Sequence, residues 1–142
     1  MTSPLSPAEL DDFRAIAGAM IPASEAHGVP GADDDRIFAE ICAGAPARAG
    51  ALRRLIRAIG DHPGALARLE RDVLEARLQA AYDRDVDAIY AHVLMHYYRD
   101  DRVMVALGLE PRPPFPVGHP LEDADPALLD PVRTRAPFWR RV

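Results

Sequence analysis

Apolar residues recur at helical spacing along residues 7–107. Ser6 and Glu9 have the spacing of a capping box, and Pro7 stands at the first helical position, so a helix is predicted to begin there. Pro22 ends this helix. The apolar residues between these limits share one helical face, and they are Leu10, Phe13, Ile16, Ala17, Met20 and Ile21.

Four further segments show the same spacing and predict helices. They cover about residues 33–44, 48–59, 65–80 and 83–98. The first of them opens with three carboxylates at 33–35, which suit the positive end of a helix. In the segment 65–80 the predicted apolar positions are Leu66, Leu69, Val73 and Leu78.

A last short helix is expected after these segments. Asp100 or Asp101 caps it, it runs through Leu107, and Gly108 ends it. No segment shows the strict alternation of a strand, and no internal repeat is found. The sequence therefore predicts an all-α fold, with a bundle of about five helices over residues 1–110.

The pattern changes after Glu110. Eight of the 14 prolines lie from Pro111 onward, and they alternate with large apolar residues. Those residues are Phe115, Leu121, Leu128, Leu129, Val132, Phe138 and Trp139. Because proline favours extended and turn conformations, residues 111–142 are predicted to form an extended, proline-rich tail. The tail carries too much apolar surface to stay in water, so we expect it to lie on its own body or on another protein.

Charge and composition exclude several functional classes. The chain has 142 residues and a net charge of −5, which argues against nucleic acid as a partner. Cys42 is the only cysteine, so an internal disulfide and a thiolate metal cluster are both impossible. No stretch approaches the roughly 20 apolar residues of a membrane helix. The N-terminus shows no signal sequence, which predicts a cytoplasmic location, or a periplasmic one if a signal was removed or a partner carries one.

One pair of histidines has the spacing of metal ligands. His92 and His96 lie four residues apart on the predicted helix 83–98. The zinc-peptidase motif requires Glu after its first histidine, and Val93 stands there instead. Histidines at the surface or in a supporting role are therefore the favoured interpretation, and a small metalloprotein that uses both is an alternative.

No other constellation suggests catalysis. The polar cluster from Tyr97 to Arg102 is interpreted as an ion-paired helix junction rather than a ligand site. The chain has no Gly-rich phosphate loop, no Ser on a nucleophile elbow and no evident base for Cys42. We therefore predict no catalytic, cofactor-binding or metal-binding residue, and a role as the binding partner of something larger. A module that associates with itself through its tail is a further alternative.

Two groups of residues carry a resemblance to a known family. Near the N-terminus, the sequence FRAIAGAMIPA at 13–23 is followed by GVPGA at 28–32. Toward the C-terminus, the residues concerned are Tyr97-Tyr98, Arg102-Val103, Ala106-Leu107-Gly108, Arg112-Pro113-Pro114, Pro116, Gly118 and Leu128 to Arg133. In order and spacing, both groups resemble the gluconate 2-dehydrogenase subunit 3 family. The residues from Cys42 to Tyr82 match that family only as generic helix.

The resemblance implies a small, non-catalytic subunit that binds and stabilises a large flavoprotein of the glucose-methanol-choline oxidoreductase type. That partner would hold FAD, oxidise a sugar or another alcohol, and pass electrons to a cytochrome or another acceptor. Many family members carry a twin-arginine signal, and this N-terminus departs from that pattern. We expect aromatic anchors to provide most of the affinity and arginines to steer association. The predicted partner-binding residues are Tyr97, Tyr98, Arg112, Pro113, Pro114, Phe115, Leu129, Arg133, Phe138 and Trp139.

Overall fold

The computed structural model describes residues 5–81, 84–113, 118 and 123–135, and their regular secondary structure is helical. Within these residues the only β interaction is an isolated bridge between Ser24 and Val29. The predicted all-α fold is therefore confirmed. The chain divides into two units, Met1–Pro111 and Arg112–Val142, which we call the body and the tail. The body and the tail are described separately below.

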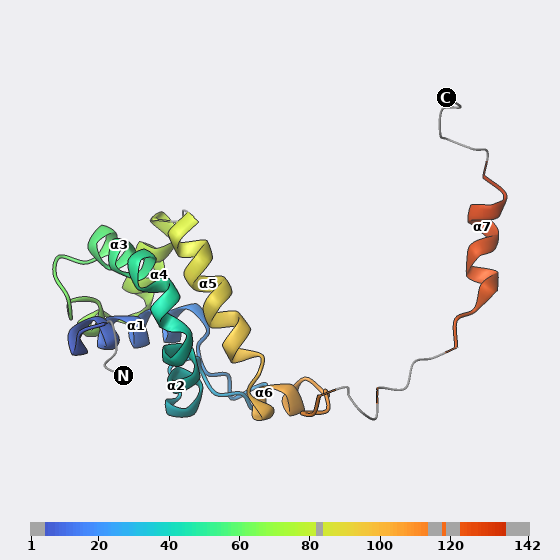
Figure 1. Cartoon of the computed structure of the whole chain (residues 1–142), viewed down its shortest axis with the longest axis horizontal. Coiled ribbons are helices and arrows are strands. Elements are labelled where there is room, and N and C mark those ends of the chain that lie inside the picture. Colours follow the sequence, from blue (N-terminus) through green and yellow to red (C-terminus); the bar gives the residue numbers. More distant parts are fainter. Residues whose placement is uncertain (1–4, 82–83, 114–117, 119–122, 136–142) are drawn as a thin grey trace. The chain divides into compact units, whose positions relative to one another are not determined.

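The described part of the body contains six α-helices and two short 3₁₀ helices (Figure 1). Most of them follow the predicted segments closely. Their bounds are α1 Pro7–Met20, α2 Asp35–Gly44, η1 Ala45–Arg48, α3 Ala49–Ile59, η2 Leu66–Arg68, α4 Arg71–Ala80, α5 Arg84–Tyr97 and α6 Asp101–Ala106. No helix in the described part of the chain is long and apolar enough to cross a membrane.

The helices begin where their capping residues stand. The Ser6 side chain accepts a hydrogen bond from the backbone N–H of Glu9 at 3.3 Å, and the Glu9 carboxylate accepts one from Ser6 at 2.7 Å. Asp34 caps α2, and Asp100 caps α6 by accepting from the backbone N–H of Arg102 at 2.9 Å. Side-chain oxygens at these positions satisfy N–H groups that have no partner within the helix. The predicted capping box and the predicted cap at Asp100 are confirmed.

The prediction of one continuous helix over residues 65–80 is wrong, because the helical conformation is interrupted between η2 and α4. The buried carboxylate of Asp12 on α1 accepts hydrogen bonds from the backbone N–H groups of Gly64, Leu66 and Ala67, at 2.7, 2.9 and 3.1 Å. These bonds hold a separate turn against α1, and the chain is extended at Leu69 before α4 starts.

The interruption also shifts the buried face of α4 by one position. Leu74 is buried and packs into the core, whereas Val73, which the sequence pattern placed on the apolar face, is 42% exposed. Leu66 and Leu78 are buried as predicted. Successive side chains of a helix point about 100° apart, so an interruption before Arg71 is enough to change which side chains of α4 face the core.

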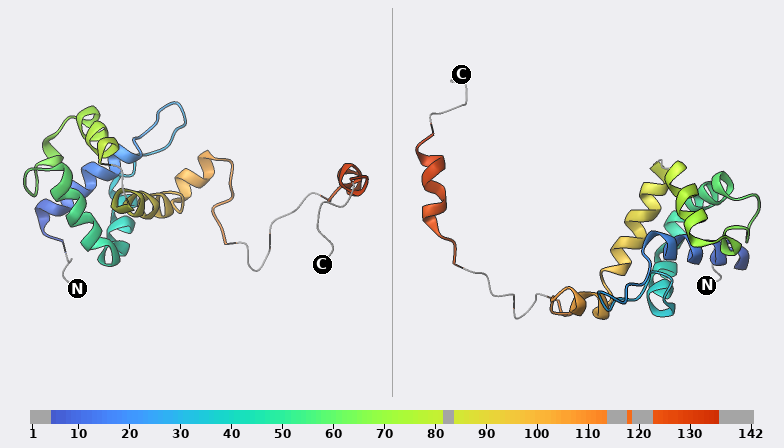
Figure 2. Two further views of the ribbon diagram at one scale, coloured as in Figure 1. Left: turned by 90° about the horizontal axis from the view of Figure 1, so that it is seen from above. Right: turned by 180° about the vertical axis from the view of Figure 1, so that it is seen from behind.

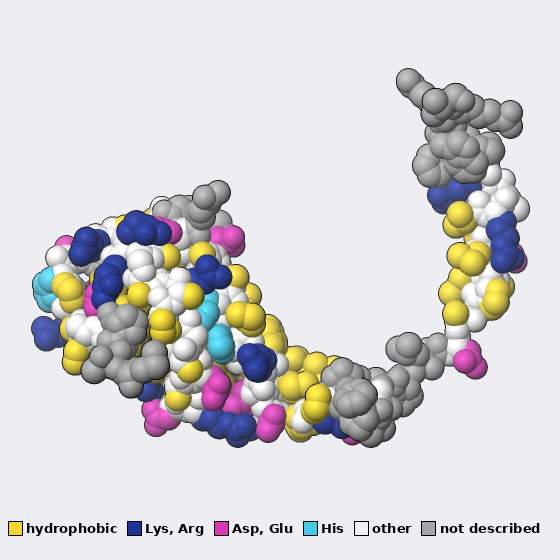
Figure 3. Space-filling model, in the orientation of Figure 1, with side chains coloured by type: hydrophobic (Ala, Val, Ile, Leu, Met, Phe, Trp, Pro, Cys, Tyr) yellow, Lys and Arg dark blue, Asp and Glu magenta, His cyan; other side chains and the backbone are white. Residues whose placement is uncertain are grey.

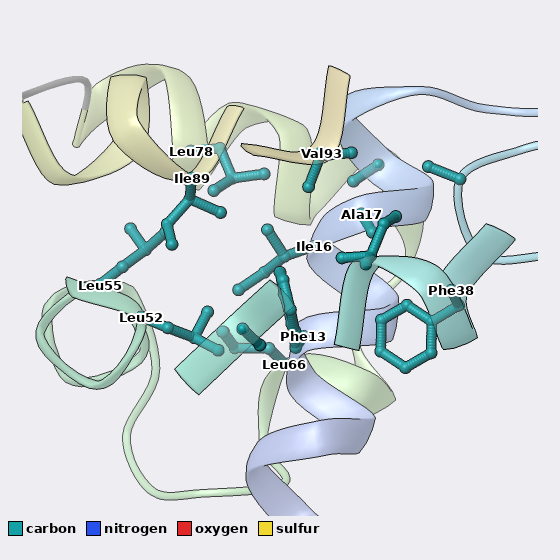
Figure 4. Packing of buried hydrophobic residues seen from close by; sticks show 14 of the residues in the cluster. Phe13, Ile16, Ala17, Phe38, Leu52, Leu55, Leu66, Leu78, Ile89 and Val93 are labelled. Carbon is teal, nitrogen blue, oxygen red and sulfur yellow. The ribbon is translucent and has the colours of Figure 1, made fainter. Parts of the chain in front are cut away.

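α1 lies at the centre of the hydrophobic core. It contacts α3, α4, α5 and η2, and Figure 2 shows it running among the other body helices. Its Phe13 and Ile16 are fully buried, and the Phe13 ring meets that of Phe38 edge-on, with 5.6 Å between centroids. Figure 4 shows these side chains together with those of Leu52 and Ile89 from α3 and α5. Every buried hydrophobic residue among those described belongs to the body, so the body has a core of its own.

Residues 126–133 of the tail are helical rather than extended, whereas the other described residues of the tail form no helix. A 3₁₀ helix, η3 Pro126–Leu129, continues directly into α7 Asp130–Arg133. Asp125 caps the first turn by accepting a hydrogen bond from Ala127 at 2.9 Å. Both prolines of this segment occupy first-turn positions, where no intrahelical hydrogen bond requires their missing N–H. The prolines are therefore compatible with helix here, which the sequence interpretation missed.

Candidate partner-binding surfaces

The end of the body nearest to the tail in sequence exposes several large apolar side chains. Within the described residues 95–109, five of them are each more than half exposed, and Figure 3 shows hydrophobic side chains gathered over α6. We call this set the α5–α6 edge, and its members are Met95, Tyr98, Val105, Leu107 and Leu109. Of these, the sequence interpretation had singled out only Tyr98. Helical periodicity was the available signal, because Met95 and Tyr98 lie off the face of α5 that carries Val93 and Tyr97.

An ion-pair network fixes α6 to α2. Arg102 donates hydrogen bonds to Asp34 at 2.6 Å and to Asp100 at 2.9 Å, and these two carboxylates cap α2 and α6. Arg36 adds weaker contacts of 3.5 Å to Asp100 and 3.4 Å to Asp101. The hydrogen bonds from Arg102 lower the pKa of Asp34 and of Asp100, although burial opposes both shifts. The polar cluster at this junction is thus an ion-paired helix junction, as interpreted from the sequence.

The structure separates the two adjacent tyrosines that were predicted to bind a partner. Tyr97 is buried, and its hydroxyl donates a hydrogen bond to the carbonyl of Pro30 at 3.0 Å. Burial raises the pKa of Tyr97, with smaller contributions from Tyr98 and Asp100. Tyr98 meets it edge-on at 5.3 Å between ring centroids and is half exposed. Tyr97 therefore contributes to the fold of the body, and Tyr98 is the one available on its surface.

Three apolar side chains of the tail are exposed on η3 and α7. Leu128 is 75% exposed, and Leu129 and Val132 are each more than half exposed. Arg133 forms an ion pair with Asp130 at 3.1 Å in which both side chains are largely exposed. Leu129 and Arg133 were predicted partner-binding residues, and the structure places them on one short helical segment.

The other predicted tail residues are only partly described. The Arg112 guanidinium donates a hydrogen bond to the carbonyl of Gly118 at 2.8 Å and a longer one, 3.4 Å, to that of Pro113. The remaining four predicted residues lie outside the described part of the chain, and they are Pro114, Phe115, Phe138 and Trp139.

His92 and His96 pack against each other rather than opening toward a common ligand. Their rings meet edge-on with centroids 4.6 Å apart, and the buried His92 donates from Nε2 to the carbonyl of Ile41 at 2.9 Å. Gly44 makes room for the pair, because a Cβ there would lie 2.8 Å from an atom of each ring. Burial lowers the pKa of His96. Among the described residues, no three His, Cys, Asp or Glu side chains are grouped to hold a metal ion.

Three further features of the body are a polar pocket, an apolar groove and the thiol of Cys42. The pocket, of about 150 Å³, borders His96 between α2 and the end of α5. The groove, of about 420 Å³, lies between α1, α4 and α5 and is lined mainly by Met20, Leu78, Val86 and Tyr90. Cys42 is half-buried, and its burial raises the pKa of the thiol, which disfavours the reactive thiolate.

Comparisons of this chain with protein-family models, with curated proteins and with solved structures give no match. The functional interpretation consequently depends on the chain's own residues and on the resemblance of its two ends described above.

Proposed function

We propose that this chain is the small, non-catalytic subunit of a large FAD-dependent oxidoreductase of the glucose-methanol-choline type, which it binds and stabilises. The observation that carries the proposal is the apolar surface of the tail, where Leu128, Leu129 and Val132 project from one helical segment. These residues belong to the sequence group that resembles the gluconate 2-dehydrogenase subunit 3 family.

The physical argument starts from the size of this segment. Helices of four residues have no stability of their own in water, because nucleating a helix costs more than a single turn returns. Burying a large aliphatic side chain contributes about 1.5–3 kcal/mol, so three such side chains favour attachment to a second surface. The polar side of the segment, with Asp130 and Arg133, suits the rim of an interface, where ion pairs mainly steer association.

We assign the chemistry to the partner. On this proposal FAD, the alcohol substrate and any electron transfer to a cytochrome belong to the flavoprotein or to a further protein. His92 and His96 pack against each other, and His92 already donates to a backbone carbonyl. The alternative of a small metalloprotein would have to displace that hydrogen bond before His92 Nε2 could bind a metal.

Self-association through the tail is the second candidate. The observation that favours it is the apolar groove between α1, α4 and α5, which offers a receptor for an apolar segment of a second copy. Light scattering separates the two candidates, since self-association predicts a dimer of the lone chain whose population rises with concentration.

The decisive experiment is affinity purification of the tagged full chain from its native cells, with the visible spectrum and subunit composition of the eluate. We expect a larger protein with flavin absorbance, in a fixed ratio to the chain, that releases FAD on denaturation. The triple variant Leu128→Gln, Leu129→Gln, Val132→Gln should lose this protein, whereas the control Val73→Gln on α4 should keep it. A colourless, monomeric full chain would overturn the proposal.

A further inference from the structure

We propose that the α5–α6 edge is a second, rigid contact surface for the same flavoprotein, so that the partner is held by the body as well as by the tail. This inference rests on the proposed function and extends it from Tyr98, which is already a predicted partner-binding residue, to four neighbouring residues that are not. Its starting point is the exposure of Met95, Tyr98, Val105, Leu107 and Leu109 at one end of the body.

The outward direction of these side chains is imposed by the fold. Val103 on α6 is buried, and Val105 follows two residues later, about 200° around the helix. On α5, the same offset separates the buried Val93 from the exposed Met95. α6 has six residues and would not hold its orientation alone, but Arg102 binds it to the capping residue of α2.

The end of α6 is fixed as well. Gly108 adopts a left-handed conformation with φ 74°. Its backbone N–H donates a hydrogen bond to the carbonyl of Val105 at 2.9 Å, and the N–H of Leu109 donates one to the carbonyl of Met104 at 2.9 Å. This is the hydrogen-bond pattern of a Schellman motif. Leu107 and Leu109 are thus held in place by backbone bonds while their side chains remain exposed. An apolar surface whose backbone is already ordered binds a partner without the entropic cost of ordering that backbone.

The position of the edge along the chain, close to predicted partner-binding residues, argues for the flavoprotein as its occupant. Leu109 precedes the tail by three residues, and three residues span at most about 11 Å even when fully extended. The prolines at Pro111 and Pro113 stiffen this connection. A flavoprotein that binds Arg112 and Pro113, which are predicted partner-binding residues, would therefore be held within reach of the edge at a high effective concentration. Charged residues of both signs, among them Arg99 and Asp101, lie in the same stretch and suit a polar rim.

The test compares two single variants of the full chain. In Val105→Gln the edge loses one exposed apolar side chain, while in Val73→Gln an exposed side chain of the same type is lost elsewhere on the body. The probe is the flavoprotein that co-purifies with the full chain, separated from it and titrated with each variant. We expect the edge variant to bind at least tenfold more weakly than the wild type, and the control variant to bind within about twofold.

A second measurement does not depend on the stability of the edge variant. With a photoreactive benzoylphenylalanine in place of Tyr98, illumination of the intact complex should join this position to the flavoprotein. A crosslink to the chain's own tail or to a second copy would overturn the inference.

The two proposals fail in different ways. If the triple tail variant loses the flavoprotein but the edge variant binds it as tightly as the wild type, the inference fails and the proposed function stands. If no flavoprotein accompanies the wild-type chain, both are overturned.

Discussion

In the body, the large apolar side chains of the central helix are hidden, as Phe13 and Ile16 show with no measurable exposure. In the tail, the apolar side chains of η3 and α7 face water, and Leu128 keeps three quarters of its surface exposed. Both regions contain helix, but only the body surrounds its helices with other helices. The contrast teaches that the body has a hydrophobic core of its own, whereas the described helical segment of the tail contains no buried residue. The following predictions test this contrast, from the largest expected effect to the smallest.

Phe13→Ala should have the largest effect, because it removes a fully buried ring from the centre of the core. We expect the free energy of unfolding to fall by about 4 kcal/mol, which is a large part of the stability of a small domain. Urea denaturation followed by circular dichroism measures this. The matched change in the tail, Leu128→Ala, should leave the stability of the isolated chain unchanged. A comparable loss in both variants would show that the tail packs as part of the folded core.

Asp12→Ala should destabilise the body by about 3 kcal/mol. The substitution leaves three backbone N–H groups of the turn at residues 64–67 without their acceptor. Asp11, which is exposed on the same helix, provides the control, and Asp11→Ala should change stability by less than about 0.5 kcal/mol. Denaturant unfolding of both variants decides the comparison, and equal effects would mean that the buried carboxylate does not hold the turn.

The Asp34–Arg102–Asp100 network should give α6 a pH dependence. Arg102 lowers the pKa of both carboxylates in the folded state, so their ionised forms stabilise it. That contribution is fully present above the ordinary carboxylate pKa of about 3.9 and is lost as the pH falls through the lowered values. The free energy of unfolding, measured between about pH 7 and pH 2, should therefore be higher for the wild type than for Arg102→Gln at neutral pH. The two values should become equal in acid.

The exposed pair in the tail provides the control for this network. Arg133→Gln removes an ion pair in which both side chains are more than half exposed, and such pairs contribute little. Its stability should equal that of the wild type at every pH. If the free energies of unfolding of the wild type and Arg102→Gln still differed in acid, the electrostatic explanation would be contradicted.

Truncation after Pro111 should have the smallest effect on the fold and the largest on association. All buried hydrophobic residues of the described chain remain in the truncated protein, so its free energy of unfolding should stay within about 0.5 kcal/mol of the full chain. Binding to the flavoprotein should at the same time be lost. A truncated body that binds with unchanged affinity would contradict the role assigned to the tail, and a large loss of stability would show that the tail belongs to the core.

The sequence alone predicted the features that depend on neighbouring residues. The capping box at Ser6, the cap at Asp100 and the stop at Gly108 each involve groups a few residues apart. The break before α4 was missed because its cause, Asp12, lies more than fifty positions earlier in the chain. The local spacing of apolar residues cannot reveal a contact between residues so far apart in the sequence. Val73 was consequently predicted on the buried face of its helix, although it is exposed.

The residues of the candidate surfaces were predicted from the sequence only in part. The exposed Leu129 and Arg133 were anticipated from the apolar content and motifs of the tail, but their helical arrangement was not, because Pro126 and Pro131 were interpreted as turn residues. Tyr97 and Tyr98 were grouped although they point about 100° apart on a helix. The partner proposed above was suggested by the resemblance and not by the fold, since an all-α body hosts many functions.

The shared guanidinium of Arg102 also determines how a mechanical load on the tail would pass into the body. A partner that pulls on residues beyond Pro111 pulls first on α6, whose N-terminus is joined through Asp100, Arg102 and Asp34 to the start of α2. Force is thereby divided between the covalent chain leading to α5 and this lateral connection. A force on the tail would therefore reach two helices of the body, α5 through the backbone and α2 through these ion pairs.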